Sequence, residues 1–273
     1  MITFPNAKIN LGLNIVSRRP DGYHNIETVF YPIPLTDSLE IVPAEGTEST
    51  LTCYGRVVDC PTEKNLVMKA YRMMEKVFGL PPVDIYLVKH IPDGAGLGGG
   101  SSDASFCMKM LNDMFELGCT DEQLAKMASK IGADCPFFIH NKPMMATGIG
   151  DEFTPTDVCL KGKHMLLVKP DASVPTKAAY AQVTPAPSAK PIPEILSDGM
   201  ENWQKELVND FEKSVFAQYP SLAEIKRTLL ESGASYAAMS GSGSSIFGIF
   251  SCAEMAEKAA DNFKEYSHFV IQL

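Results

Sequence analysis

The feature that most constrains this chain of 273 residues is a glycine-rich segment at residues 92–104. It holds five glycines within the seven positions from Gly94 to Gly100. Residues 83–91 predict a strand before it, and apolar residues at helical spacing over 106–115 predict a helix after it. Because glycine lets the backbone approach a bound group and turn its amides inward, the segment predicts a backbone-lined binding loop.

The two serines at the end of this segment indicate what the loop binds. Ser101 and Ser102 stand where the predicted helix begins, and the exposed amides and dipole of a helix N-terminus attract anions. A polyphosphate is therefore the expected guest. A flexible turn is a weak alternative, because plain turns rarely need so many glycines or two serines at the helix start.

Two other phosphate-binding motifs fail on context. The glycines at 94, 96 and 99 match the dinucleotide fingerprint, but that motif needs a second parallel strand that ends in an acidic residue. Here a helix, Gly118 as its predicted stop and another helix follow instead. The second helix is predicted from a capping box at Thr120 to Gln123 and runs to about Gly132. A Walker loop is excluded because no lysine follows the glycines.

The first strand has a polar face. Apolar and polar residues alternate over residues 6–16, so that Lys8 and Asn10 project to the same side. A strand lysine on a polar face is usually solvated. This face also carries Asn6 and Asn14 and no other charge, whereas a solvated strand would more often mix lysine with glutamate or threonine.

Asp134 is a single carboxylate among small and apolar residues, two positions before a proline. It is either a turn-forming aspartate or a base in a partly desolvated pocket. The residues alone leave these two interpretations about even.

The second half of the chain predicts a β-α-β-β-α-β order, which is the ferredoxin-like pattern. A proline-rich exposed loop at 184–193 interrupts it. The predicted strands are 165–168, 235–239, 245–250 and 268–272, and the predicted helices are 203–218, 221–232 and 253–265. The segment from Ser240 to Ser245 alternates serine and glycine, which suits either a simple hairpin loop or part of a site.

Composition excludes some functions. A net charge of -9 argues against a nucleic-acid or membrane-surface protein. The seven cysteines are scattered with no C-x-x-C pair, which favours reduced thiols over zinc or disulfides. The N-terminus is too polar for a signal peptide, so we expect a cytoplasmic protein that binds no membrane.

The glycine loop resembles that of a known family. The string Gly96 to Ser102, behind Pro92, is similar to the phosphate loop of the GHMP kinases. Other segments are also similar to motifs of this family, namely residues 5–11, Gly22-Tyr23-His24 and the serine-glycine segment at 240–245. The resemblance covers essentially the whole chain. It is strongest to members whose acceptor carries cytidine diphosphate and that serve non-mevalonate isoprenoid synthesis.

The resemblance implies the fold. We expect an α+β chain with the GHMP kinase two-domain fold. Residues 1–158 would form an N-terminal ATP-binding domain like domain 2 of ribosomal protein S5, and residues 159–273 would form a ferredoxin-like C-terminal domain. The active site is expected in the cleft between them.

The resemblance also implies the roles of residues. Asp134 matches the family's base and Lys8 its partner, with ATP and Mg²⁺ as expected cofactors. No metal ligand is assigned, although Ser101 or Ser102 could contribute one, and the oligomeric state stays open. The expected ATP-binding residues are Asn65, Pro92, Asp93, Gly94, Ala95, Gly96, Leu97, Gly98, Gly99, Gly100, Ser101 and Ser102. The expected acceptor-binding residues are Asn10, Tyr23, His24, Tyr180, Gly241 and Ser242.

Two rival functions remain at this point. One is another GHMP kinase, such as a homoserine kinase, whose acceptor has no base. The other is a non-catalytic nucleotide sensor on the same fold, which would be expected to have lost Lys8 or Asp134.

Overall fold

The computed structural model describes residues 1–57 and 60–273. Its contacts divide the chain into two compact units, and each is built from segments that are not contiguous in sequence. Unit 1 comprises Met1–Ala7, Leu35–Asp93 and Gly98–Lys142. Unit 2 comprises Lys8–Pro34, Gly94–Leu97 and Pro143–Leu273. The predicted domain boundary after residue 158 is defined along the sequence and stays a prediction.

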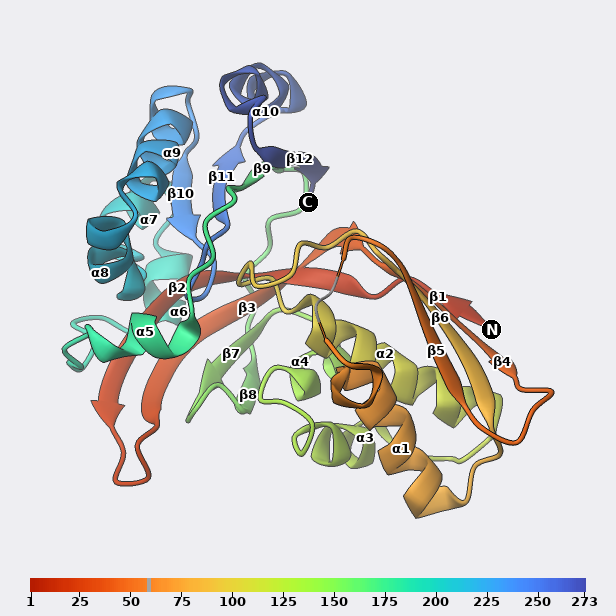
Figure 1. Ribbon diagram of the computed structural model, residues 1–273. Coiled ribbons are helices and arrows are strands. Elements are labelled where there is room, and N and C mark those ends of the chain that lie inside the picture. Colours follow the sequence, from red (N-terminus) through yellow and green to blue (C-terminus); the bar gives the residue numbers. More distant parts are fainter. Residues whose placement is uncertain (58–59) are drawn as a thin grey trace. The chain divides into compact units, whose positions relative to one another are not determined.

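Unit 1 is a four-stranded sheet covered by helices (Figure 1). The strand order is β1 (Ile2–Thr3), β4 (Ser38–Pro43), β6 (Val83–Lys89) and β5 (Thr50–Gly55), and only β5 runs parallel to its neighbour. The helices are α1 (Leu66–Phe78), α2 (Gly99–Met114), α3 (Asp121–Ala128) and α4 (Cys135–His140), with a short 3₁₀ turn at Thr62–Lys64. Alternate residues of β4 and β6 pack with α1 and α2 in one apolar cluster that includes Leu39, Ile85, Leu87, Tyr71, Met74, Cys107 and Leu111.

The predicted elements of unit 1 are partly confirmed. Strand β6 is present, and the capping box of Thr120 and Gln123 begins α3. Helix α2 begins at Gly99, before the apolar pattern over 106–115 starts. Its first turn contains Gly99 and Gly100, which have no apolar side chain to contribute to such a pattern. It ends at Met114, so the predicted stop at Gly118 is wrong. Helix α3 likewise ends at Ala128, four residues before Gly132, and the short helix α4 was not predicted.

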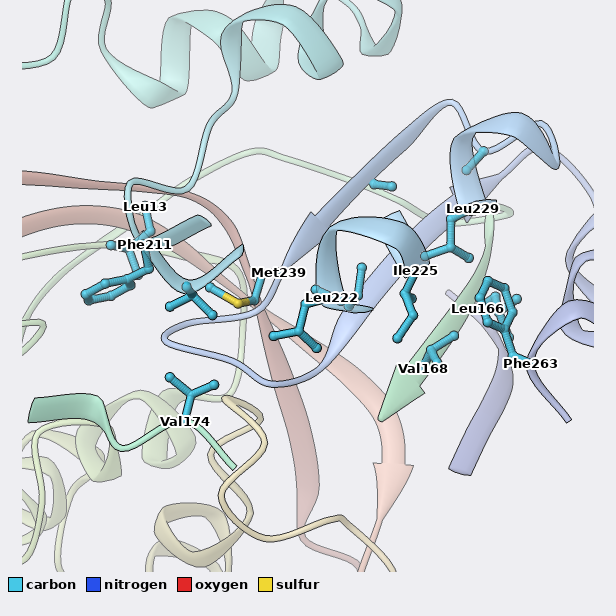
Figure 2. Packing of buried hydrophobic residues seen from close by; sticks show 14 of the residues in the cluster. Leu13, Leu166, Val168, Val174, Phe211, Leu222, Ile225, Leu229, Met239 and Phe263 are labelled. Carbon is cyan, nitrogen blue, oxygen red and sulfur yellow. The ribbon is translucent and has the colours of Figure 1, made fainter. Parts of the chain in front are cut away.

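The C-terminal part of unit 2 confirms the ferredoxin-like pattern. Strands β9 (His164–Lys169), β10 (Tyr236–Met239), β11 (Ile246–Phe250) and β12 (Ser267–Gln272) form an antiparallel sheet in the order β10-β11-β9-β12. Helices α9 (Pro220–Glu231) and α10 (Ala253–Ala260), followed by a 3₁₀ turn at Asp261–Phe263, pack on one face of it. Figure 2 shows this cluster, in which Leu222, Ile225 and Leu229 of α9 lie over Leu166 and Val168 of β9.

The predicted helix over 203–218 is wrong. It is broken into α7 (Met200–Glu206) and α8 (Phe211–Gln218). The residues between pair with strand β2, since Leu13 N–H donates to the Val208 carbonyl at 2.8 Å and Asp210 N–H donates to the Leu13 carbonyl at 2.8 Å. Pairing with a distant strand overrides the local helical pattern. The proline-rich segment is irregular up to α6 (Ile192–Ser197), and α5 (Thr176–Ala181) precedes it.

A second sheet has the order β2 (Asn6–Arg18), β3 (His24–Thr36), β7 (Met144–Thr147) and β8 (Glu152–Pro155). The predicted strand over 6–16 is confirmed as β2. On its polar face Lys8 and Asn10 are buried, at 4% and 2% exposed, and Asn6 and Asn14 are partly buried, which excludes a solvated lysine. In the part of the chain that the structure describes, no helix is both long and apolar enough to span a bilayer.

Candidate active site

The first half of the glycine loop, Gly94–Leu97, is bound within unit 2 from two sides. Lys8 N–H donates to the Leu97 carbonyl at 3.0 Å, and the Ser240 hydroxyl donates to the Gly96 carbonyl at 2.8 Å. Gly96 has a φ of +75°, and a Cβ there would lie 2.0 Å from the Ser240 carbonyl oxygen. Position 96 therefore has to be glycine, and the serine-glycine segment lies directly against the loop.

Asn209 holds that serine-glycine segment in place. Its side-chain Nδ2 donates to the carbonyls of Met239 and Gly241, each at 2.8 Å. The Ser242 hydroxyl lies 3.1 Å from the Thr176 hydroxyl. Sequence reasoning missed Asn209, because it lay inside a predicted helix; the Asn-Asp pair at 209–210 was the available signal, since these residues favour turns over helix interiors.

Lys8 and Asn10 contact one another, as their spacing on β2 predicts. Lys8 Nζ donates to Asn10 Oδ1 at 2.8 Å, and the ammonium also lies 4.5 Å from the centroid of the Phe30 ring. Asn10 Nδ2 donates to the Thr28 hydroxyl at 3.0 Å. The lysine charge is thus buried with polar and aromatic partners, which is the environment of a positioned group rather than a surface charge.

The second half of the loop forms the start of α2 in unit 1. Gly98 precedes the helix with a φ of +71°, and Gly99 packs so closely on Ile91 that a Cβ would lie 2.9 Å from its side chain. The first N–H groups of a helix have no intrahelical acceptor and attract anions. The Ser102 hydroxyl, in the same turn, is buried and has no hydrogen-bond partner. This end of α2 has the unused donors that a phosphate-binding loop requires.

A buried charge cluster supports this turn. Lys89, at the end of β6, donates to the carboxylates of Asp37 and Asp103, the latter at 2.6 Å, and Asp37 also accepts the N–H groups of His90 at 2.5 Å and Ile91 at 2.8 Å. The cluster therefore ties β6 and the residues entering the loop to the first turns of α2. Sequence reasoning missed it; the signal was a lysine among apolar residues at the end of a strand.

Burial and charge shift the pKa values in this cluster. Desolvation, together with the charge of Asp37, raises the pKa of Asp103 to about 7, although Lys89 opposes the shift. Burial alone would lower the pKa of Lys89, but the charges of Asp103 and Asp37 raise it. Two carboxylates thus share one lysine, and all three residues are buried.

Asp134 lies in the turn that enters α4. The next residue, Cys135, is buried, and its carbonyl accepts the Ser105 hydroxyl of α2 at 2.7 Å. Burial raises the pKa of the Cys135 thiol to about 11, which indicates apolar surroundings. Helix α2 therefore fixes the turn that carries Asp134. Lys8 belongs to unit 2 and Asp134 to unit 1, so their pairing stays a prediction.

The three predicted aromatic residues of unit 2 differ in their contacts. The rings of His24 and Tyr180 stack, with centroids 4.9 Å apart and an interplanar angle of 17°. Tyr180 also packs edge-on against Phe211, with centroids 4.8 Å apart. Tyr23 is 61% exposed in the turn between β2 and β3. The structure thus brings together His24 and Tyr180 from distant parts of the chain.

The remaining predicted ATP residues lie in unit 1 or on the loop. Asn65 is the N-cap of α1, where its Oδ1 accepts the N–H of Val67 at 2.9 Å. That bond gives Asn65 a structural role, and its predicted place near adenine stays a prediction. Pro92 is buried before the loop, and Asp93 is exposed.

Comparison with known proteins agrees with this geometry. The family model described as "GHMP kinases N terminal domain" matches residues 65–142, and the model described as "GHMP kinases C terminal" matches residues 189–268. The fold and the glycine loop define a small-molecule phosphotransferase of this type. The chain belongs to the GHMP kinases.

Individual relatives narrow the comparison. The chain is 55% identical over 260 residues to a protein of Bacteroides fragilis named 4-diphosphocytidyl-2-C-methyl-D-erythritol kinase, covering 94% of this chain and 95% of that one. A protein of the same name from Parabacteroides distasonis is 54% identical, covering 98% and 96% of the two chains.

Solved structures extend the likeness to the fold. A crystal structure named 4-(cytidine 5'-diphospho)-2C-methyl-D-erythritol kinase superposes with a TM-score of 0.85 at 31% identity, covering 99% of this chain and 98% of that one. Mevalonate kinase of Methanococcus jannaschii superposes with a TM-score of 0.74 at 14% identity, covering 100% and 98%, which shows a shared fold alone.

Proposed function

We propose that this chain transfers the terminal phosphoryl group of ATP to a hydroxyl of 4-diphosphocytidyl-2-C-methyl-D-erythritol, in non-mevalonate isoprenoid synthesis and in the cytoplasm. The observation that carries the proposal is the glycine loop held against buried Lys8, in a chain 55% identical over 94% of its length to a relative of that name. The retention of Lys8 and Asp134 favours catalysis over nucleotide sensing.

The loop binds the nucleotide through its backbone. The amides of Gly94–Gly100 and the first N–H groups of α2 point at the phosphates, and the helix dipole adds favourable charge. The Lys89 cluster keeps this turn rigid, so that the donors are in place before the nucleotide arrives. Asn65 completes the nucleotide site near the adenine.

Lys8 and Asp134 act on the reacting hydroxyl. Phosphoryl transfer has a loose transition state, so positioning and charge stabilisation supply most of the acceleration. Asp134 orients the acceptor hydroxyl and takes its proton. Lys8, with its ammonium held by Asn10, stabilises the negative charge on the transferring group and keeps Asp134 ionised.

The residues present fit a magnesium ion carried on the nucleotide phosphates. Mg²⁺ prefers oxygen ligands and is usually bound through phosphates, waters and one or two protein oxygens. The Ser102 hydroxyl, which is unpartnered in the first turn of α2, is the protein oxygen that best fits this role, with Ser101 beside it. When bound, the ion neutralises developing charge on the phosphates.

The acceptor is recognised by its base. His24 and Tyr180 present a stacked aromatic pair, and a stacked base contributes about 1–3 kcal/mol in such sites. Tyr23 also lies at the base, and Asn10, Gly241 and Ser242 surround the rest of the acceptor. A homoserine kinase would need no such aromatic pair.

The test is an ADP-release assay on the purified protein with three acceptors. We expect turnover with the diphosphocytidyl substrate and none with homoserine or mevalonate. Turnover with homoserine or mevalonate instead would overturn the acceptor assignment. ATP hydrolysis without any acceptor serves as the background control.

A second measurement isolates the base-binding site. Cytidine diphosphate without the methylerythritol should compete with the acceptor and not with ATP, because it keeps the stacked base. Tyr180→Ala should weaken this inhibition and raise the KM for the acceptor, with little change in the KM for ATP. Inhibition that is competitive with ATP alone, or absent at millimolar concentration, would contradict the cytidine site.

A further inference from the structure

The side-chain amide of Asn10 has a defined orientation, because Thr28 and Lys8, the nearest partners of its two ends, can each play only one role. The Thr28 hydroxyl donates its single proton to the Gly12 carbonyl at 2.5 Å. Toward Asn10 it can therefore only accept, and Asn10 Nδ2 lies 3.0 Å away. Lys8 Nζ has only donors, and Asn10 Oδ1 lies 2.8 Å from it. Both ends of the amide require the same orientation.

Burial makes this orientation costly to reverse. Thr28 is fully buried at 0% exposure, and water does not replace its contacts. A flipped amide would place two donors, Asn10 Nδ2 and Lys8 Nζ, against each other. It would also place Asn10 Oδ1 against a hydroxyl oxygen whose proton is already used. Buried groups left without partners in this way are strongly disfavoured.

The backbone of β2 completes the constraint. Asn10 N–H donates to the Ser240 hydroxyl at 3.3 Å, and that hydroxyl donates to Gly96 of the loop at 2.8 Å. The main chain at Asn10 is thus fixed independently of its amide. What remains to be set is the amide rotation, which Lys8 constrains from one end and Thr28, on the neighbouring strand β3, constrains from the other.

We propose that Thr28 is a positioning residue that fixes the Lys8 ammonium through the amide of Asn10. This inference rests on the proposed role of Lys8 in phosphoryl transfer. Thr28 itself touches no reacting group. Without its hydroxyl the Asn10 amide is held only from the Lys8 side, and the position of the Oδ1 that accepts from the Lys8 ammonium is less well defined.

The test compares Thr28→Val with Thr28→Ser in the ADP-release assay. Valine keeps the shape of the side chain and removes the hydroxyl, whereas serine keeps the hydroxyl. We expect Thr28→Val to lower kcat by about 10- to 100-fold, since small misplacements of a catalytic group cost that much. The KM for ATP should stay within about 2-fold, and Thr28→Ser should keep kcat close to that of the parent.

A second pair of variants tests the direction of the hydrogen bond. Asn10→Asp places an acceptor opposite the Thr28 oxygen, so two acceptors face each other. Removing that oxygen in the double variant Asn10→Asp/Thr28→Val relieves the conflict. We therefore expect the double variant to lose less kcat than the product of the losses in the two single variants. A loss equal to that product would contradict the proposed contact.

The outcomes separate this inference from the proposed function. If the unmodified protein does not turn over the diphosphocytidyl substrate, the proposed function fails. If it does, and Thr28→Val has the same kcat, or Thr28→Ser is impaired as much as Thr28→Val, the positioning role is overturned. If Thr28→Val does not fold, Thr28→Ala is measured at lower temperature instead. Its kcat is compared with that of Thr28→Ser, and the same outcomes support or overturn the positioning role.

Discussion

Lys8 and Asp134 were both ambiguous as single residues in the sequence. For Lys8 the structure resolves the ambiguity, because a lysine that is 4% exposed, with its ammonium bonded to Asn10, excludes a solvated side chain. For Asp134 it resolves less: the turn is packed against α2, but its role as the base rests on the proposed function. Residue types and alternation predicted which face of β2 carries Lys8 and left the role of Asp134 open. They could not predict burial, which depends on residues far away in the sequence.

Asp134→Asn is the sharpest test at this scale. We expect the variant to fold and bind ATP but to lose about 10²–10⁴-fold in kcat, the usual contribution of a general base. The measurements are the ADP-release rate, ATP binding by calorimetry and the circular dichroism spectrum. Asp113→Asn, an exposed aspartate on α2, is the matched control. Turnover close to that of the parent would remove Asp134 from the mechanism.

Elements with strong local signals were predicted well. The β-α-β-β-α-β order and the capping box of α3 depend on local patterns, and both are confirmed. The break between α7 and α8 was missed because it depends on pairing of residues 208–210 with Leu13. The glycine loop was predicted as an element, whereas its packing against Ser240 and the Lys89 cluster depends on tertiary contacts that no local pattern encodes.

Two glycines of the loop make a matched pair. Gly96 and Gly94 both have positive φ, so alanine strains the backbone at either position. Only at Gly96 would the added Cβ meet the Ser240 carbonyl, whereas at Gly94 it meets nothing within 4 Å. We expect Gly96→Ala to lower the melting temperature without nucleotide clearly more than Gly94→Ala does. Equal decreases in melting temperature for the two variants would show that the close approach of Gly96 to the Ser240 carbonyl does not affect the stability of the alanine variant.

The Lys89 cluster predicts a pH dependence of stability. The pKa of Asp103 is raised to about 7 when folded and is about 3.9 when unfolded. The folded state therefore keeps the proton longer, and this group's contribution to stability falls as pH rises from about 4 to 7 and levels off above that. In Asp103→Asn this contribution is absent.

The measurement is the melting temperature of the parent minus that of Asp103→Asn between pH 5 and 8. We expect this difference to decrease as pH rises. Asp113→Asn, which changes an exposed carboxylate on the same helix, is the matched control for the substitution. An increase with pH would mean that the attraction of Lys89 outweighs burial and would contradict the raised pKa.

For the whole molecule, the main fact is that neither unit is a continuous piece of chain. The backbone passes between the units five times, after residues 7, 34, 93, 97 and 142. Strands β2 and β3 each continue through such a crossing. The family resemblance implied a simple division after residue 158, and no local signal marks a crossing in the middle of a strand.

We expect the two units to unfold together. The single tryptophan, Trp203, is buried in unit 2, and Cys107 is buried in unit 1, so each reports on one unit. In a urea titration, Trp203 fluorescence and the labelling of Cys107 by a thiol reagent should give the same midpoint. The variant Trp203→Phe emits from tyrosine alone, and its fluorescence shows how much of the signal of the parent comes from Trp203. Separate midpoints would show that the units unfold independently.

The interleaved segments have a consequence for synthesis. Unit 1 has all its segments once residue 142 has been made, whereas Leu13 and Ile15 of β2 pack in one cluster with Phe211 and Met239. At about 5–20 residues per second, roughly 10 to 45 seconds separate the translation of Leu13 from that of Met239. The strand that carries Lys8 is therefore among the first parts to leave the ribosome, and although β3 follows it directly, its apolar partners Phe211 and Met239 are among the last.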